Sequence, residues 1–236
     1  MQPLRLVLVP GLDGTGLLFA PFLKAWPGAA TVVSLPPDPA QGYEGLLTFL
    51  QSSLPDNEPY VLLGESFSGP LVLRIAAAPP PGLLGLVLCV TFARNPLGPF
   101  GGLARLLARP GLLSRIPRPF LRRQLLGREE TPELITLLQE TLPETPVQVI
   151  ASRIHALTRV DATPELRACR LPILVLSARA DTVVPARCTA HILRHAAQAE
   201  WREFPGPHLL LQTRPEPAAA AILGFMKAHG LMTSSH

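Results

Sequence analysis

Short apolar runs alternate along the chain with longer segments in which apolar residues recur every three or four positions. The short runs have the length of buried strands, and the longer segments have the period of amphipathic helices. Strands are expected at 5–9, 31–35, 60–63, 84–90, 173–177 and 200–204, and helices at 44–54, 67–78, 185–197 and 215–229. Strands that alternate with helices predict an α/β fold: a mostly parallel sheet with helices on both faces.

The alternation stops between Arg94 and Leu166, where helical patterns follow one another without a strand signal and prolines at 96, 99, 110, 117, 119, 132, 143 and 146 divide them. Connections between a strand and the next helix are usually short. We therefore expect one domain with a core at 1–93 and 167–236 and a helical cap inserted at about 94–166. The alternative is a set of ordinary crossover helices. A length of 236 residues suits a single domain.

Apolar residues make up 47% of the chain, which raises the question of a membrane span. The longest uncharged stretch, Ile75–Ala93, is interrupted by three consecutive prolines, so no transmembrane helix is expected. The first five residues form neither a basic leader nor a long apolar run, which predicts a cytoplasmic protein. The three cysteines are widely spaced, which predicts reduced thiols rather than disulfides or a zinc site.

Ser66 follows an apolar run and precedes an amphipathic segment, with small residues on both sides. A serine on such a sharp strand-to-helix turn is held out at the carboxyl edge of a sheet, where the crowded backbone requires small residues two positions away. Gly64 and Ser68 occupy these positions, and Gly69 lets the helix approach the sheet. Ser68 replaces the second glycine of Gly-x-Ser-x-Gly. The alternative is a turn in which Ser66 only caps a helix.

Asp181 and His208 each follow a predicted strand, at 173–177 and 200–204. With Ser66 they give the order nucleophile, acid, base, and all three lie beyond carboxyl strand ends, where open α/β sheets assemble their sites. We therefore expect Ser66 as nucleophile, His208 as its general base and Asp181 as the group that orients the histidine. Asp161 is a competing acid, but its Asp-Ala-Thr-Pro-Glu-Leu context is typical of a helix cap.

A glycine-rich loop, Pro10–Gly16, follows the first predicted strand at the same edge of the sheet. Acyl transfer needs hydrogen-bond donors for a developing oxyanion, and backbone amides supply them. The amides of Leu12 and Phe67 are the candidates, the second because Phe67 follows the nucleophile. Alternatively, glycines 11, 14 and 16 form a phosphate-binding turn with Asp38 as a ribose-binding acid. That dinucleotide hypothesis leaves Ser66 and the C-terminal acid and histidine unexplained.

The remaining titratable residues carry weaker signals. Cys188, His191 and His195 share one helical face at metal-ligand spacing, but no second cluster completes a site, which favours a partly solvated face and no metal. Asp13 has the context of a turn-forming aspartate. Glu65, beside the nucleophile, either hydrogen-bonds within the site or faces solvent.

Four segments together resemble the α/β-hydrolase superfamily: Val9-Pro-Gly-Leu-Asp-Gly-Thr-Gly, Gly64-Glu-Ser-Phe-Ser-Gly, Ala180-Asp-Thr-Val-Val-Pro and Gly206-Pro-His. The resemblance covers the core, roughly 5–93 and 171–227. The oxyanion loop, with Pro10-Gly11, is similar to the hydrolase part of plant phytyl ester synthases. This resemblance implies carboxylesterase, thioesterase or acyltransferase chemistry on apolar acyl groups.

A serine carboxylesterase acting on a small-molecule ester is the main expectation, and its acyl-serine mechanism requires no metal or organic cofactor. A thioesterase, an acyltransferase or a catalytically silent ligand-binding protein on the same scaffold are the alternatives. A silent protein would leave Ser66 unlabelled by a fluorophosphonate probe.

The net charge of +4 is unevenly distributed, because every charged side chain from Arg94 to Arg128 is an arginine. Leucines are interleaved with these arginines. A cap of this kind is suited to shelter an acyl chain and to contact anionic lipid. The alternative is that the leucines pack on the core and the arginines are solvated. Nucleic-acid binding is not expected, since aromatic residues are only 6% of the chain and no recognition motif is present.

Overall fold

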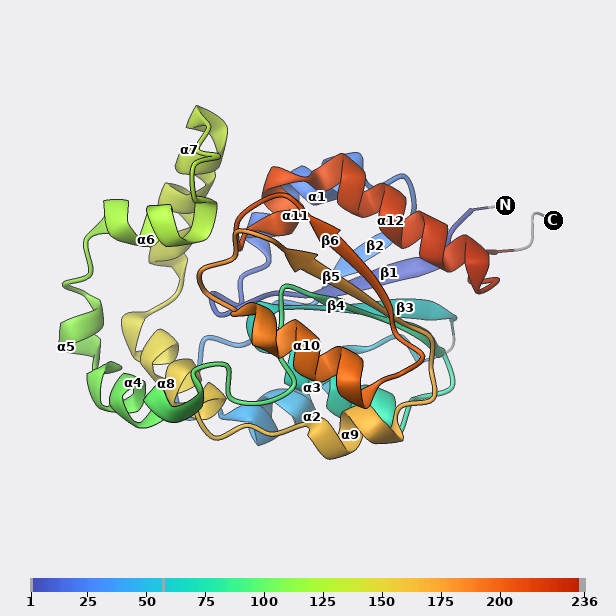
Figure 1. The fold of residues 1–236 in the computed structure, drawn as a ribbon, viewed down its shortest axis with the longest axis horizontal. Coiled ribbons are helices and arrows are strands. Elements are labelled where there is room, and N and C mark those ends of the chain that lie inside the picture. Colours follow the sequence, from blue (N-terminus) through green and yellow to red (C-terminus); the bar gives the residue numbers. More distant parts are fainter. Residues whose placement is uncertain (1, 57, 234–236) are drawn as a thin grey trace.

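The computed structural model, which describes residues 2–56 and 58–233, contains a six-stranded sheet in the order β2-β1-β3-β4-β5-β6 (Figure 1). All neighbouring strands pair in parallel. The strands are β1 (Arg5–Val9), β2 (Ala30–Val32), β3 (Tyr60–Glu65), β4 (Leu83–Cys89), β5 (Ile173–Ala178) and β6 (Glu200–Phe204). Each overlaps a predicted strand, so the expected α/β fold with a parallel sheet is confirmed.

Helices cover both faces of the sheet (Figure 1). On one face lie α1 (Ala20–Ala25), α11 (Leu210–Thr213) and α12 (Pro215–Ala228). On the other lie α2 (Tyr43–Ser53), α3 (Gly69–Ala77), α9 (Thr163–Ala168) and α10 (Ala186–His195). Successive strand side chains point to opposite faces. Thus Leu6 and Leu8 pack with α1 and α12, whereas Val7 and Val9 pack with α2 and α3.

Two differences from the predicted elements have a local cause. β2 ends at Val32 rather than residue 35, because the Leu35 amide donates to Gly14 O (2.7 Å) and the chain turns toward the glycine loop. No helix was predicted at α1, which has only six residues and carries Pro21 in its first turn. Buried Phe22, within α1, and Trp26, at its end, anchor it to the sheet.

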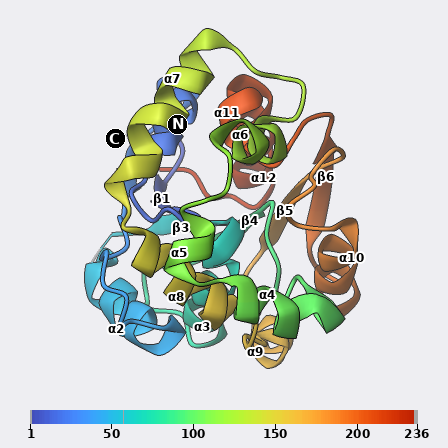
Figure 2. The same ribbon diagram turned by 90° about the vertical axis from the view of Figure 1, so that its left-hand side faces the viewer.

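The segment between β4 and α9 forms a series of short helices at one end of the molecule (Figure 2). They are η3 (Gly98–Phe100), α4 (Gly101–Leu107), α5 (Pro110–Leu113), α6 (Arg118–Leu126), α7 (Pro132–Thr141), η4 (Leu142–Glu144) and α8 (Val147–Leu157). Proline occupies the first or second position of several of them, where its missing N–H costs nothing. The prolines therefore divide the segment by starting helices.

A small apolar cluster joins this segment to the core. Leu126 of α6 and Leu138 of α7 pack with Leu18 and Leu209, which come from the core. Other cap leucines do not pack in this way, since Leu103, Leu106, Leu107 and Leu112 are exposed. Some leucines of this segment are therefore packed against the core, whereas others face solvent. No helix in the described part of the chain is long and apolar enough to cross a bilayer.

Candidate active site

Ser66 lies on the turn between β3 and α3, at the carboxyl edge of the sheet. Its φ is 50°, a left-handed conformation that is costly for a residue with a side chain. The neighbours must be small: a Cβ on Gly64 would lie 2.6 Å from Val72 Cγ2, and one on Gly69 would lie 2.0 Å from Thr91 Oγ1. The turn is therefore the strained, crowded one that the sequence predicted, and it holds Ser66 half-buried.

The structure brings the three predicted residues together. His208 Nε2 lies 3.0 Å from Ser66 Oγ, and His208 Nδ1 lies 2.8 Å from Asp181 Oδ2. Asp181 Oδ1 accepts hydrogen bonds from the amides of Val183 and Val184, both at 2.8 Å. Only 6% of the His208 side chain and 5% of the Asp181 side chain are exposed. A buried carboxylate fixed by two amides is a rigid partner for the imidazole.

The loops that carry the acid and the histidine are joined by backbone hydrogen bonds. The Ala180 amide donates to Gly206 O (2.9 Å), and the Arg179 amide donates to Phe204 O (2.9 Å). These bonds extend the β5–β6 pairing beyond the strands themselves. The distance between Asp181 and His208 is therefore set by the sheet.

The glycine loop approaches Ser66 closely. A Cβ on Gly11 would lie 3.4 Å from Ser66 Cβ, so the loop backbone is nearly in van der Waals contact with the nucleophile. Within the described residues, no turn or loop hydrogen bond uses the amide of Leu12 or Phe67 as donor. Phe67 lies in the first turn of η2 (Ser66–Ser68), where a helix leaves its amides without internal acceptors. The amide of Phe67, which follows Ser66, and that of Leu12, which follows Gly11, are therefore not used in these turn and loop hydrogen bonds.

Arg153 of α8, which the sequence analysis did not single out, holds this loop. It is 2% exposed and donates to Leu12 O (2.8 Å) and Pro36 O (3.0 Å). Its guanidinium fills the space beside Gly14, where a Cβ would lie 2.3 Å from Nη1. A side chain at position 14 would therefore collide with Arg153, which explains the glycine there.

Ser68, the departure from Gly-x-Ser-x-Gly, has a structural explanation. It is fully buried, and its hydroxyl donates to Pro10 O, which links the nucleophile turn to the glycine loop. Thr91 donates to Ser66 O, and the Tyr43 hydroxyl donates to Phe67 O at 2.9 Å. A sequence pattern alone gives no signal for these contacts, because each joins segments far apart in the chain.

Glu65 does not face solvent. It is 4% exposed, and Gln212 Nε2 donates to its Oε1 at 3.2 Å. The pKa of this carboxyl is raised from 4.5 to about 7, mainly by burial; the Gln212 hydrogen bond and His208 lower it, and the nearby Asp13 charge adds to the rise. A titratable group therefore lies directly behind the nucleophile.

The other candidates have local roles. Asp161 Oδ1 accepts from the Thr163 amide (2.9 Å) at the start of α9, as a helix cap does. Asp13 Oδ2 accepts from the amide and hydroxyl of Thr15 (3.0 and 2.6 Å), as a turn-forming aspartate does. His191 Nε2 lies 2.9 Å from Thr163 Oγ1, and burial lowers the pKa of this histidine. Among the described residues, no group of three or more His, Cys, Asp or Glu side chains is arranged to hold a metal ion.

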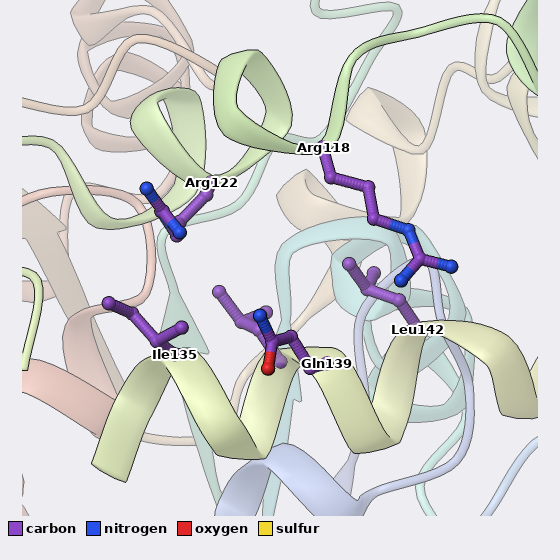
Figure 3. A pocket seen from close by; sticks show the side chains of 6 residues that line it. Arg118, Arg122, Ile135, Gln139 and Leu142 are labelled. Atoms are coloured by element: carbon purple, nitrogen blue, oxygen red, sulfur yellow. The ribbon is translucent and has the colours of Figure 1, made fainter. Parts of the chain in front are cut away.

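Two cavities lie outside the triad. A small cavity of about 40 Å³ lies between α6 and α7. Arg118 and Arg122 line it from α6 and face Ile135, Gln139 and Leu142 (Figure 3). A larger one of about 350 Å³ lies between α10 and the segment after β4. Its lining residues are Ala93, Arg94, Asn95, Gly98, Arg187, Cys188 and His191. Neither is lined by a triad residue, and only the larger has the volume of a typical small-molecule site.

The Alpha/beta hydrolase family model matches residues 6–221, so the chain belongs to this family. Phytyl ester synthase 1, chloroplastic, from Arabidopsis thaliana is 37% identical over 106 residues, which are 40% of this chain and 15% of that protein. The match thus covers only a small part of that relative.

Solved structures of other hydrolases have the same fold. A lipase-esterase related protein from Clostridium acetobutylicum gives a TM-score of 0.80 over 95% of both chains at 16% identity. An enol-lactonase from Burkholderia xenovorans gives 0.81 over 96% of this chain and 92% of its own, at 19% identity. A thermophilic esterase from Thermogutta terrifontis gives 0.80 over 98% and 92%, at 21% identity. The chain therefore belongs to the Alpha/beta hydrolase family and shares its fold with these structures.

Proposed function

We propose that this protein is a serine hydrolase that cleaves carboxylic esters with an apolar acyl group through an acyl-Ser66 intermediate. The observation that carries the proposal is the continuous hydrogen-bonded line from Ser66 Oγ through His208 to Asp181, at 3.0 and 2.8 Å. These distances lie within the range in which a histidine can take the proton of a serine.

In the proposed reaction His208 Nε2 takes the Ser66 proton as Oγ attacks the ester carbonyl carbon. The Leu12 and Phe67 amides donate to the oxyanion of the tetrahedral intermediate, and Asp181 stabilises the imidazolium. The ester C–O bond then breaks, and the leaving alkoxide takes the proton from His208. Water, deprotonated by His208, attacks the acyl-serine and releases the carboxylic acid and free Ser66.

The apolar cluster beside the triad supports an apolar acyl group. Leu209 directly follows the histidine, Leu18 lies close after the glycine loop, and both pack with Leu126 and Leu138 of the cap. An ester with a long acyl chain partitions into lipid, and the arginine-rich segment 94–128 supports the predicted contact with anionic lipid. The cap insertion thus provides the apolar wall in this proposal.

A second function, acyl transfer, is favoured by one observation. The Arabidopsis relative is named as an ester synthase. In the same mechanism an alcohol in place of water would attack the acyl-serine and form a new ester. The same residues would carry out hydrolysis and acyl transfer, and they would act on a thioester in the same way.

The test uses a fluorophosphonate probe and a series of p-nitrophenyl esters from acetyl to long acyl chains. The native chain should be labelled at Ser66 and should hydrolyse the esters. Ser66→Ala and His208→Ala should each lower turnover by several orders of magnitude while the fold is retained, because triad residues act as a unit. A native chain that is neither labelled nor active would instead be a silent ligand-binding protein.

The acyl specificity is tested by Leu125→Ala and Leu134→Ala, two half-buried residues that pack on the cap cluster. Each should reduce kcat/KM for long acyl chains by roughly fourfold per buried methylene lost, and should leave acetyl esters nearly unchanged. Leu112→Ala is the matched control, because Leu112 is 41% exposed. Equal losses for short and long esters would place acyl specificity in the core loops.

A further inference from the structure

Most of the exposed large apolar side chains gather in one short segment. Of the eleven such residues in the described chain, seven lie between 100 and 120, and they are 40–68% exposed. They are Phe100, Leu103, Leu106, Leu107, Leu112, Ile116 and Phe120. Together with the exposed arginines of residues 100–123, we call these residues the cap face. Scattered exposed leucines are ordinary, but a cluster of this kind marks an interaction surface.

The charge of the cap face has one sign. Its exposed arginines are Arg105, Arg109, Arg115, Arg118 and Arg123. The first acidic residue after Arg94 is Glu129. In the part of the chain that the structure describes, none of these five arginines forms a salt bridge. The face therefore combines exposed apolar area with uncompensated positive charge.

The cap face adjoins the triad. At the end of α6, Gln124 accepts from Thr182 (2.8 Å to its Oε1), and Leu125 O accepts from the Leu209 amide (3.1 Å). These contacts fix α6 against the residues that follow Asp181 and His208. Val183, in the same acid loop, is 37% exposed and extends the apolar surface toward the site. Figure 1 shows α4, α5 and α6 at the end of the molecule opposite to the C-terminal part of α12.

We propose that the cap face docks the protein on an anionic lipid membrane. The helices that carry it, α4, α5 and α6, have 7, 4 and 9 residues, so they lie on a bilayer and do not span it. Their apolar side chains enter the headgroup region, while the guanidinium groups remain at the level of the lipid phosphates. Delivery of a membrane ester to Ser66 rests on the proposed function, whereas the attachment itself does not.

Other occupants match the cap face less well. A two-fold contact with a second copy would bring five unpaired arginines against five identical ones, and this repulsion would oppose association. A nucleic acid would pair with the arginines but leave the leucines and phenylalanines in water. An anionic bilayer is complementary to both properties at once.

The experiment measures cosedimentation of the full chain, carrying Ser66→Ala, with vesicles of phosphatidylcholine mixed with phosphatidylglycerol and with vesicles of phosphatidylcholine alone. We expect binding to the mixed vesicles that weakens with added salt. Arg115→Gln combined with Arg118→Gln should weaken it about 25-fold, since each arginine contributes roughly fivefold. Arg159→Gln combined with Arg170→Gln is the matched control, because both are exposed arginines outside the cap face.

A second pair of variants tests the apolar part. Leu106→Ser combined with Phe120→Ser should also weaken binding at least tenfold, because each buried methylene contributes roughly fourfold, and Leu84→Ser is the exposed control. All cap-face variants should hydrolyse water-soluble esters at the native rate. Binding that is lost with the arginines but not with Leu106 and Phe120 would overturn the proposed entry of the apolar side chains, because an electrostatic contact with the headgroups alone would then account for the binding.

Two further results distinguish the membrane docking from the proposed hydrolase function, and a third tests whether a second copy covers the cap face. A native chain that hydrolyses soluble esters but ignores mixed vesicles overturns the docking and leaves the proposed function intact. A chain that binds mixed vesicles but is neither active nor labelled supports the docking and overturns the proposed function. A stable dimer in solution that Leu106→Ser and Phe120→Ser dissociate would show that a second copy covers the cap face, and would overturn the docking.

Discussion

Arg153 is a buried cation whose replacement tests how the cap helix α8 and the glycine loop cooperate. Its two shortest hydrogen bonds go to Leu12 O (2.8 Å) and Pro36 O (3.0 Å), and burial lowers the pKa of its guanidinium while the Asp13 charge opposes this. Arg153→Met keeps an unbranched, flexible side chain but is shorter and removes all of the donors. The variant therefore leaves the Leu12 and Pro36 carbonyls without their charged partner. It also removes the contact that holds the glycine loop at Leu12, whose amide is a proposed oxyanion donor.

The expected size of the effect follows from these contacts. Leaving a buried acceptor unsatisfied costs about 1–3 kcal/mol, and the loss of a buried cation offsets part of this, so we expect a net loss of about 2–4 kcal/mol in the free energy of unfolding. Complete loss of one oxyanion donor lowers kcat about 100- to 1000-fold. Because the Leu12 amide is displaced rather than removed, the fall in kcat should lie below that limit, with KM little changed.

Two measurements separate positioning from simple destabilisation: urea unfolding, and steady-state hydrolysis of a soluble ester under conditions where the variant is fully folded. Arg153→Lys, which retains one charged donor, should recover part of kcat. Arg5→Met is the control, because Arg5 contacts Thr31 and Glu58 in the core sheet, away from the glycine loop. A native kcat per folded molecule in Arg153→Met would refute the positioning role.

Two other predictions concern carboxylates. Asp181→Asn should lower kcat by about 10⁴-fold because the histidine loses its orienting partner, whereas Asp161→Asn should retain kcat and nearly all of the stability, because the amide oxygen of Asn can still accept from the Thr163 amide; the opposite ranking in a hydrolysis assay would move the acid into the cap. Glu65→Gln should flatten the dependence of stability on pH. The folded pKa of about 7 exceeds the ordinary 4.5, so the native chain loses up to about 3 kcal/mol as pH rises through this window. Urea unfolding at several pH values tests this prediction. It would be wrong if the free energy of unfolding changed equally with pH in the native chain and in Glu65→Gln.

Local sequence patterns were enough to predict the sheet and the order of the candidate site residues along the chain. Strand alternation and helical spacing are local properties, and they indicated all six strands and the four longer core helices. A serine between Gly64 and Ser68 also has a local meaning, because the turn is crowded by its own strand and helix. Asp181 and His208 were found because parallel strands bring their carboxyl ends to one edge, so position along the chain becomes position in space.

The contacts around Ser66, Asp181 and His208 could not be predicted from the sequence, because they join segments that are far apart in the chain. Arg153 and Ser68 reach carbonyls of the glycine loop that lie 141 and 58 positions away in sequence, and neither shares a pattern with its partner. The exposure of the leucines in the cap could not be predicted from the sequence either. Helical spacing marks an apolar face but not what covers it, and here Leu126 is buried against the core while Leu106 remains exposed. That difference depends on which other segments reach each face, and periodicity in one segment carries no information about it.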